Sequence, residues 1–479
     1  MEYLSVVPPL LAIFLAVVTR NVYIALLIAL GLSETLMLFL APERSALSAL
    51  DAIAPAIAEI GDGSLLSVTA PFLGALGGAS RTAAVFDSGY NTQVLLFCLL
   101  IGILIAFMRE SGGVNALAHR LMANGVAGTR RRAEAIVAGT GSAVFIETNV
   151  SLLSSGVLGR PLYNAHGLSR ERLAYMIDST SAPISVLILL NGWGAYALGL
   201  VGGYGFDDPV EVVLGTIPLN LYPILTLIGV WLTVATGKAI GPMRRTAAIP
   251  PGADDNADVT EGGKAIFMWL PLLVMVGGAL AFMAWTGNGD IRQGAGATSI
   301  LWAILLAILT AGTLLIGAGS LKGRIEATAF KGLSEMVPLV SVLLLSIALG
   351  ESLRALGTGD VIAALAAQTL PGFAVPALLF VAAGLTSFTT GTSWGTYGIL
   401  VPIAMPLAAA LGIPPSLALA AVLGGGVFGD HCSPISDTSV IASVAAGTSL
   451  YDHVRTQLPY ALIAGALTIM LYLGIGAIA

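Results

Sequence analysis

The stretch "GGGVFGDHCSPISDTS" occupies residues 424–439 and decides which kind of fold the chain adopts. Both of its flanks are apolar: SLALAAVL (416–423) precedes it and VIASVAAG (440–447) follows it. The stretch itself carries two aspartates, a histidine, several hydroxyls and a proline. Ionisable side chains at membrane depth are costly and mark functional sites, so this pattern predicts a helix that is broken inside a membrane.

The composition supports a membrane setting for this stretch. The chain has 479 residues, of which 56% are hydrophobic and only 10% are charged, whereas about 25% of the residues of a soluble domain are charged. Apolar runs of about 20 residues, the length that crosses a hydrocarbon core of about 30 Å, recur throughout. The first of them, residues 6–18, lacks the basic region and cleavage site of a signal peptide, so we expect a retained helix. The sequence therefore predicts an all-α polytopic membrane protein.

We expect about 10–11 transmembrane helices. The predicted spans are 4–19, 21–41, 90–109, 168–203, 210–236, 265–285, 298–318, 334–350, 415–447 and 456–478. Segments 45–60 and 64–80 are short and rich in Gly and Ala, which favours interfacial helices and leaves an eleventh span as the alternative. The polar segment 241–264 contains Pro and Gly and is predicted to be a flexible linker.

Two further segments are too long for one ordinary span and break in the middle. Residues 131–161 carry GTGS and residues 373–412 carry TTGTSWG, so each is predicted to form a re-entrant hairpin with a Gly/Thr/Ser tip. A helix that should also break follows each hairpin, at MIDSTSAPIS (176–185) and at FGDHCSPIS (428–436). Gly139 precedes Asp178 by the same number of residues as Gly391 precedes Asp430, which indicates an internal duplication.

An odd number of expected crossings separates the start of one repeat from the start of the other, so the two repeats should be inverted. The basic residues agree, because this topology leaves only Arg81, Arg292 and Arg354 in the outer segments that it assigns. The predicted parts are N-terminal helices (1–89), a first inverted repeat (90–236), a cytoplasmic linker (237–264), connecting transmembrane helices (265–333) and a second inverted repeat (334–479).

The ionisable residues inside the predicted spans and hairpins point to the chemistry. They are Glu34, Glu147, Asp178, Asp430, His431 and Asp437. A carboxylate at the bilayer centre costs about 2.5–3.5 kcal/mol on insertion scales, and no Lys or Arg lies near these motifs in the sequence. Protons, metal cations or a cationic substrate are therefore the expected counter-charges. Glu34 lies outside both repeats, and a structural role is an equal alternative for it.

The backbone and the hydroxyls complete the predicted site. Pro183 and Pro434 interrupt the helical hydrogen bonds, so the freed carbonyls can bind a cation and the next helix start can bind an anion. Hard oxygen donors suit sodium-like ions. The predicted ion- or substrate-binding residues are Glu147, Asn149, Asp178, Ser179, Thr180, Ser181, Thr390, Thr392, Ser393, Asp430, His431, Ser433, Ser436, Asp437 and Thr438.

Each of these residues also has a simpler interpretation. A lone Ser or Thr in a membrane helix often bonds back to its own backbone, and the glycines at 424–426 favour close helix packing over a binding loop. His431 could relay protons near neutral pH or act only as a polar neighbour. Asp178 and Asp430 are the stronger candidates, because each begins a duplicated segment that ends in Pro-Ile-Ser.

GDHCSPISDTS (429–439) together with GTSWGTYGILVPIA (391–404) resembles the signature pair of the NhaC family of sodium/proton antiporters. The repeat of a hairpin and a broken helix is similar to the wider ion-transporter superfamily, which includes dicarboxylate/sodium symporters. The resemblance covers roughly residues 90–479 and adds Trp394 to the predicted site. It implies sodium binding, for which Asp430, Asp437, Ser433 and Thr438 are the predicted ligands.

The expected function is sodium (or lithium)/proton antiport by alternating access, with cation and proton competing for the carboxylates. The first repeat departs from the motif, since Val186 stands where the second repeat has Asp437. The alternative is therefore a sodium- or proton-coupled carrier of a small organic acid, amino acid or amine, for which Asn191 and Trp193 would line a larger pocket.

Other classes of protein fit less well. An intramembrane aspartyl protease would have Gly-x-Gly-Asp, but Val427 replaces the first glycine, and the His-Glu-x-x-His of a zinc protease is absent. We therefore expect no enzyme, and a channel fits paired broken helices less well than a carrier does. No cofactor is expected beyond the transported sodium and protons. The expected partners are monovalent cations, protons and membrane lipid, with a small organic solute as an alternative and no nucleic acid. The expected location is the cell inner (plasma) membrane. A homodimer is an open alternative.

Overall fold

The computed structural model describes residues 2–19, 21–46, 63–112, 116, 128–145, 148–188, 191–206, 208–247, 263–289, 294–321, 323–359, 361, 364–365 and 371–478. These residues form helices and connecting turns, without strands. Nine of the described helices are long and apolar enough to cross a membrane, and ten are if one bent pair counts as a single span. The prediction of an all-α polytopic membrane protein is confirmed.

The helices follow one another in the order of the predicted spans. They are α1 Val7–Thr19, α2 Val22–Leu40, α4 Gly63–Ala84, α5 Gly89–Glu110, α7 Arg130–Ala143, α8 Thr148–Ala165, α9 Arg170–Leu187, α10 Gly192–Val201, α11 Pro209–Leu214, α12 Leu221–Thr236, α13 Ile266–Thr286, α14 Gly296–Gly317, α15 Ile325–Ala355, α17 Val375–Thr390, α18 Ser393–Leu411, α19 Pro415–Cys432, α20 Asp437–Ala446 and α21 Leu450–Gly476. The ambiguous segment 64–80 lies in α4, which is not among the helices apolar enough to span. Most of segment 45–60 lies outside the described residues.

The hairpin and the broken helix occur twice, as the duplication predicts. Helices α7 and α8 pack as the first hairpin and are followed by α9 and α10. Helices α17 and α18 pack as the second hairpin and are followed by α19 and α20. At the second tip Gly391 adopts φ 72°, a left-handed conformation that ends α17 and lets Thr392 cap α18. The opposite orientation of the two repeats and the boundaries of the five parts stay predictions.

The break of the first repeat lies later than the sequence indicates. Asp178 and Pro183 are inside the continuous helix α9, which ends at Leu187, and α10 begins at Gly192. A proline removes one backbone hydrogen bond, but this does not end α9, which continues for one more turn after Pro183. The second break follows the prediction, because α19 ends at Cys432 and α20 begins at Asp437 on either side of Ser433–Ser436.

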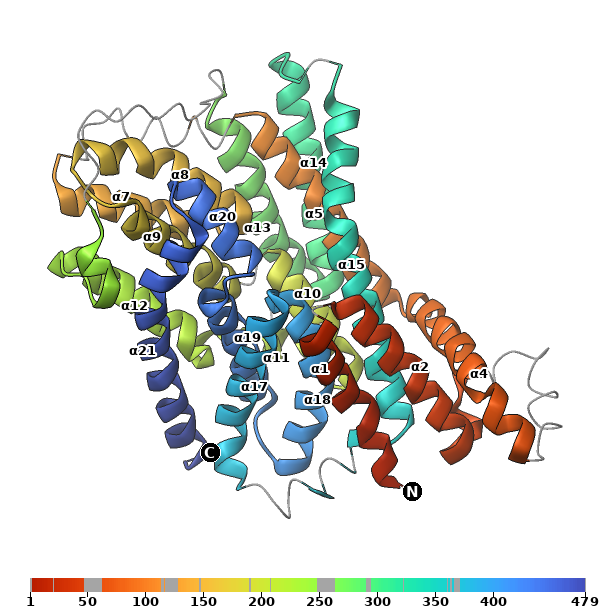
Figure 1. Cartoon of the computed structure of the whole chain (residues 1–479). Helices are drawn as coiled ribbons and strands as arrows, with labels where there is room; N and C mark the ends of the chain where they lie inside the picture. The colour runs from red at the N-terminus through yellow and green to blue at the C-terminus, as the bar shows by residue number, and fades with distance from the viewer. Residues whose placement is uncertain are drawn as a thin grey trace.

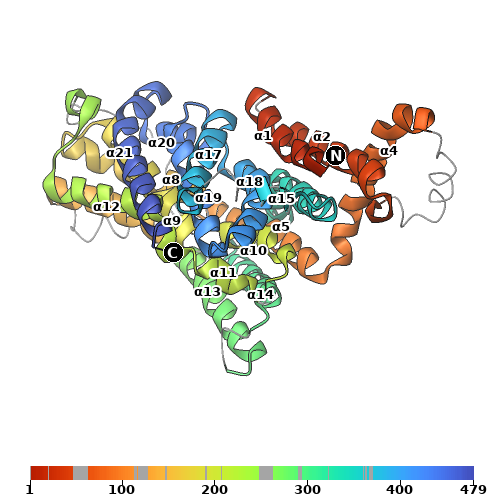
Figure 2. The ribbon, with the colours of Figure 1, turned by 90° about the horizontal axis from the view of Figure 1, so that it is seen from below.

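The helices gather into a central group with two projecting arms. Helices α7, α8, α9 and α20 lie together at the upper left of Figure 1, above α17, α18 and α19. Seen from below, α1, α2 and α4 extend to one side of this group, and the pair α13 and α14 extends to another (Figure 2). The candidate site lies in the central group, where the two repeats meet.

Two hydrophobic cores hold this central group together. The smaller core joins side chains of α7, α8, the first half of α9 and α20, whereas the larger core contains the second half of α9 and most of the buried apolar residues of α19. Arg160 of α8 fastens α20 to the smaller core by donating from Nε to the carbonyl of Ala445 at 2.8 Å. The boundary between the cores therefore passes Asp178 on α9 and the break between α19 and α20.

Candidate functional site

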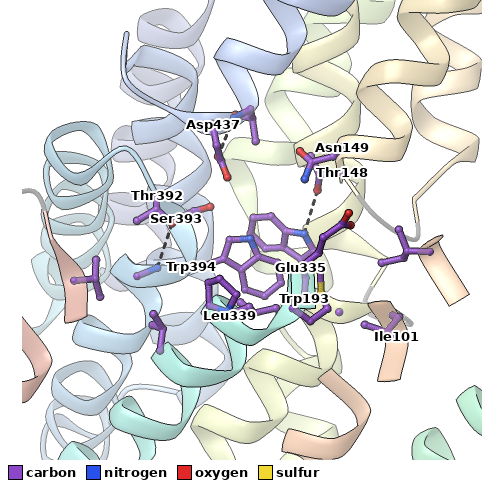
Figure 3. Close-up of a pocket in the computed structure, with 18 of the residues that line it drawn as sticks. Ile101, Thr148, Asn149, Trp193, Glu335, Leu339, Thr392, Ser393, Trp394 and Asp437 are labelled. Atoms are coloured by element: carbon purple, nitrogen blue, oxygen red, sulfur yellow. Dashed lines mark hydrogen bonds between the residues drawn. The ribbon is translucent and has the colours of Figure 1, made fainter. Parts of the chain in front are cut away.

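A cavity of about 420 Å³ opens where the first residues of five helices converge. Its lining includes Asn21 and Val22 of α2, Thr148 of α8, Trp193 of α10, Ser393 of α18 and Asp437 of α20. Figure 3 shows Asp437, Asn149, Thr392 and Ser393 around this space. Each helix start carries unpaired N–H groups and about half a positive charge, so this wall of the cavity favours anions. Residues of α5 and α15 form a more apolar wall.

Two tryptophans face each other at this cavity. The rings of Trp193 and Trp394 have their centroids 4.4 Å apart, and Trp193 donates from Nε1 to Thr148 Oγ1 at 3.2 Å (Figure 3). Tyr196 donates to the carbonyl of Trp394 at 2.8 Å. The two helices begin alike, since Asn191-Gly-Trp-Gly-Ala-Tyr and Thr392-Ser-Trp-Gly-Thr-Tyr share a capping residue and the Trp-Gly-x-Tyr order. The cavity therefore has a rigid aromatic floor built from both repeats.

Two carboxylates also line the cavity. Asp437 is exposed to it and accepts a hydrogen bond at Oδ1 from the N–H of Thr438 at 2.8 Å. Glu335 of α15 is held by Arg109 of α5, which donates two hydrogen bonds at 2.7 and 3.1 Å. Glu335 is thus neutralised by its partner, whereas no Lys or Arg in the described part of the chain bonds to Asp437.

The break between α19 and α20 places Asp430 just behind this cavity. Asp430 is 1% exposed, and its Oδ1 accepts from the hydroxyl of Ser387 at 2.8 Å. Its carbonyl oxygen, near the end of α19, accepts from Ser433 N–H at 3.2 Å and from Ser439 Oγ at 3.1 Å. Ser433 Oγ donates to the carbonyl of Phe388 at 2.7 Å, which ties the break to the second hairpin. Carbonyl, carboxylate and hydroxyl oxygens are thus concentrated at this break.

A third cluster surrounds Asp178 on α9. Its Oδ2 accepts from Gln457 Nε2 at 2.7 Å and from Ser439 Oγ at 3.3 Å, and lies 3.1 Å from His453 Nε2. Ser179 donates to Gln457 Oε1 at 3.4 Å, and Gln457 Nε2 also lies 3.2 Å from the carbonyl oxygen of His431. The His431 ring is held by Tyr222, whose hydroxyl is 2.9 Å from Nδ1. Helices α9, α19, α20 and α21 therefore meet at one buried carboxylate.

Several predicted residues have structural bonds instead of facing the cavity. The hydroxyls of Thr180 and Thr390 donate back to the carbonyls of Met176 and Thr386 in their own helices. The Ser181 hydroxyl pairs with Ser151 at 2.8 Å. Thr438 lines the cavity, although its hydroxyl also pairs with Ser436 at 3.1 Å. Glu147 lies outside the described residues, whereas its neighbour Asn149 lines the cavity.

Glu34 and Asn191 also have clear partners away from the carboxylates of the repeats. Glu34 is fully buried on α2 and accepts from Arg81 Nε at 2.9 Å and from Ser352 Oγ at 2.8 Å, so an arginine compensates its charge. Asn191 caps α10 and donates from Nδ2 to the carbonyls of Phe145 and Ser185 at 2.8 and 2.7 Å. Asn191 thereby positions Trp193, which lines the cavity in its place.

The candidate cation site depends on oxygen atoms. Among the described residues, no three side chains of His, Cys, Asp or Glu converge as ligands of one metal ion. Comparison with known proteins shows which family the chain belongs to. The model of the Na+/H+ antiporter family matches residues 174–477, which include the aspartates on α9, α19 and α20.

The chain belongs to the Na+/H+ antiporter family.

The matches between this antiporter and its relatives cover different shares of the chain. An uncharacterised protein of Haemophilus influenzae is 29% identical and covers 98% of this chain and 90% of its own. The Na+/H+ antiporter NhaC of Alkalihalophilus pseudofirmus is 39% identical over 22% of each chain. The Arginine/ornithine antiporter ArcD of Halobacterium salinarum is 38% identical over 22% of this chain and 23% of its own. The resemblance to the NhaC family that the motifs indicate is confirmed.

The fold of the antiporter is shared with two solved transporters. MtrF of Neisseria gonorrhoeae, whose structure illuminates a class of antimetabolite efflux pumps, matches with a TM-score of 0.56 at 12% identity over 84% of each chain. The YdaH transporter of Alcanivorax borkumensis matches with a TM-score of 0.55 at 14% identity over 83% of this chain and 86% of its own. The chain is therefore a multi-pass membrane protein and a secondary transporter of monovalent cations and protons, not an enzyme.

Sequence reasoning missed the partners of the antiporter's aspartates. Ser387, Ser439, His453 and Gln457 bond to Asp430 or Asp178 but were not among the predicted residues. A signal for two of them was available: His453 and Gln457 are four residues apart on the apolar helix α21, so they share one face. The chain has only four histidines, and one inside a membrane helix is a functional candidate.

Proposed function

We propose that this antiporter exchanges sodium or lithium for protons across the cell inner (plasma) membrane by alternating access. One observation carries the proposal: Asp430 and Asp437 flank the break between α19 and α20, and no Lys or Arg of the described residues bonds to either. The carbonyl of Asp430 and the hydroxyls of Ser433 and Thr438 would complete an oxygen site for sodium.

The buried charge explains why cation and proton exclude one another. An uncompensated carboxylate in the membrane costs about 2.5–3.5 kcal/mol, so the empty, ionised state is unfavourable. Sodium or a proton can each remove this cost, whereas binding of one lowers the affinity for the other. A carrier that changes its orientation only when occupied therefore exchanges the two ions.

The dependence of sodium affinity on pH tests the exchange. We expect the apparent dissociation constant for sodium, measured with the purified protein in proteoliposomes, to rise as the pH falls from about 9 to about 6. The expected change is up to about tenfold per pH unit for each proton displaced. A constant that does not depend on pH would contradict sodium/proton exchange.

A second candidate function is supported by the size of the cavity. Its volume of about 420 Å³ exceeds the roughly 30 Å³ of one water molecule more than tenfold. The five helix starts would hold a carboxylate, Asp437 would hold an ammonium group, and Trp193 and Trp394 would pack against the body of the solute. The Malate-2H(+)/Na(+)-lactate antiporter of Bacillus subtilis, 38% identical over 19% of this chain, supports a coupled carrier of a small organic acid or amino acid.

Uptake by proteoliposomes distinguishes the two candidates. We expect a sodium gradient to drive accumulation of at least one of lactate, malate, arginine and ornithine if the cavity binds an organic solute. Trp394→Ala should then raise the KM of that solute several-fold, whereas Trp285→Ala, on the exposed side of α13, should not. Sodium-driven proton movement without uptake of any of these solutes would reject the second candidate and leave the first.

A further inference from the structure

Asp178 and His453 form an enclosed acid–base pair outside the cavity of about 420 Å³. Both side chains are fully buried, and His453 Nε2 lies 3.1 Å from Asp178 Oδ2. The two residues lie on α9 and α21 and are not among those that line that cavity. No lysine or arginine of the described residues bonds to the pair.

Each member of the pair has a buried acceptor atom without a partner. Asp178 Oδ1 and His453 Nδ1 make no hydrogen bond with any residue that the structure describes. If neutral His453 donates from Nε2 to Asp178, its Nδ1 is left with a free lone pair. Buried polar atoms are normally hydrogen-bonded, so an unpartnered acceptor on each member shows that the pair has room to hold one more proton.

We propose that the Asp178–His453 pair is the proton-binding site of the antiporter, separate from the cation site at the α19–α20 break, and that Ser439 couples the two sites. The proposal rests on the proposed exchange of sodium for protons, but it places the proton at this pair instead of on the carboxylates at the break. With neutral His453 and ionised Asp178 the pair carries one negative charge, and one added proton makes it neutral.

A second cavity gives the pair its own access. This cavity of about 320 Å³ lies between α12 and α21, and no residue lines both cavities. Ser179, His431 and Gln457 stand at its inner end, and Thr236 and Lys238 line it near the end of α12. Gln457 lines the cavity and also donates to Asp178 at 2.7 Å. Water in this space would therefore be one side chain away from the pair.

The Ser439 hydroxyl connects the proton site to the cation site. It lies 3.3 Å from Asp178 Oδ2 and 3.1 Å from the carbonyl oxygen of Asp430, but a hydroxyl has only one hydrogen to donate. A charged acceptor forms a hydrogen bond about twice as strong as a neutral one. Ser439 therefore donates to Asp178 while the pair is negative, which frees one lone pair of the Asp430 carbonyl for sodium.

Protonation reverses this arrangement. When the pair is neutral, its attraction for the Ser439 hydrogen weakens, and the hydroxyl turns to the Asp430 carbonyl. A lone pair that would bind sodium is then occupied. Proton and sodium thus exclude one another although they bind different atoms, and the coupling acts equally in both directions.

Other titratable groups face the pair and also act on its charge. Asp430 and His431 face it from α19, Asp437 from α20 and Tyr222 from α12. The two aspartates repel a negative pair. Sodium bound between them cancels part of this repulsion and so lowers the affinity of the pair for a proton. Direct electrostatics therefore reinforces the hydroxyl coupling.

Sodium binding to purified variants tests the proposal. We expect the dissociation constant of Asp178→Asn for radioactive sodium to change less than about twofold from pH 6 to pH 9, because the altered pair cannot take up the coupled proton. The sodium affinity of the unmodified protein should weaken by up to about tenfold for each unit by which the pH falls. Asp87→Asn, at an exposed position outside the long helices, is the matched control and should behave as the unmodified protein does. If Asp178→Asn retains the full pH dependence, the proton binds elsewhere and the proposal is wrong.

Two further measurements keep the test decisive if Asp178→Asn does not fold. Sodium chloride, but not choline chloride, should release protons from the unmodified protein in weak buffer, and His453→Gln should abolish this release while retaining sodium binding. Ser439→Ala should still take up a proton at the pair at low pH, but sodium should release that proton less effectively than it does from the unmodified protein. Full proton release from His453→Gln would overturn the assignment.

The outcomes separate this inference from the proposed function. Absence of sodium binding by the unmodified protein at every pH would overturn sodium/proton exchange and this inference with it. Sodium binding that stays pH-dependent in both Asp178→Asn and His453→Gln would overturn only the separate proton site.

Discussion

Asp430 and Asp437 differ in what surrounds them, although both flank the same break. Asp430 is buried and accepts from Ser387, whereas Asp437 begins α20 and reaches the cavity. The carboxylate of Asp437 can therefore meet an incoming cation first, and the carbonyl of Asp430 can bind it from behind.

The first prediction concerns the charge of Asp430. Asp430→Asn is nearly isosteric and can still accept from Ser387, so the protein should remain folded but lose sodium-driven proton exchange by more than about a hundredfold in rate. Proteoliposome exchange, with thermal stability measured on the same preparation, checks it. Asp87→Asn, an exposed aspartate, should leave the exchange unchanged. An active Asp430→Asn would remove this carboxylate from the site.

At the scale of single residues, the sequence indicates the charged members of the site and misses their partners. Carboxylates in apolar segments stand out without any structure, which is why Asp178, Asp430 and Asp437 were predicted. Ser387 and Ser439 meet these aspartates only because distant helices pack together, and no local pattern encodes such a contact. Hydroxyls such as those of Thr180 and Thr390 look alike in sequence whether they face a cavity or their own helix.

At the scale of helices, close approach of backbones sets the distance between α19 and α17. Gly425 and Gly429 of α19 lie so near α17 that a Cβ on either would collide with the carbonyl of Phe380 or of Gly384. The glycines at 424–426 thus serve close packing, as the simpler interpretation holds. The same proximity brings Ser387 of α17 to Asp430.

The second prediction tests this packing. Gly425→Ala should lower the thermal stability of the protein and slow exchange, because the added methyl group pushes α19 away from α17 and Asp430 away from Ser387. Gly139→Ala is a matched control, since a Cβ there has open space and alanine is about 1 kcal/mol better than glycine inside a helix. Equal melting temperatures for the two variants would contradict the packing argument.

Helix boundaries were predictable where a turn residue determines them. The second hairpin turns at Gly391 with a left-handed backbone, as its Gly/Thr/Ser sequence indicates. The first break was placed too early because a proline marks a weak point in a helix without showing whether neighbouring contacts end it. In the structure the end of α9 is fixed by Asn191, which bonds to Ser185 and to the first hairpin through Phe145.

At the scale of the whole molecule, the third prediction concerns the orientation of the repeats. Single cysteines at Arg132 and Gly372, both exposed, should react with membrane-impermeant reagents from opposite sides of the membrane. The background lacks Cys98 and Cys432, which are both buried. Labelling of both sites from the same side would contradict inverted repeats. The sequence alone could predict this topology because crossing number and basic residues are counted without knowing any contact.

The fastening of α20 to α8 by Arg160 affects how the protein is made. Arg160 and its acceptor Ala445 are 285 residues apart in the chain. At a synthesis rate of about 5–20 residues per second, roughly 15–60 s pass before the ribosome supplies the second partner. During that time the side of α8 that packs against α20 in the finished protein, including Gly156, has no α20 to cover it. The first hairpin therefore reaches its final packing only after the last helices emerge.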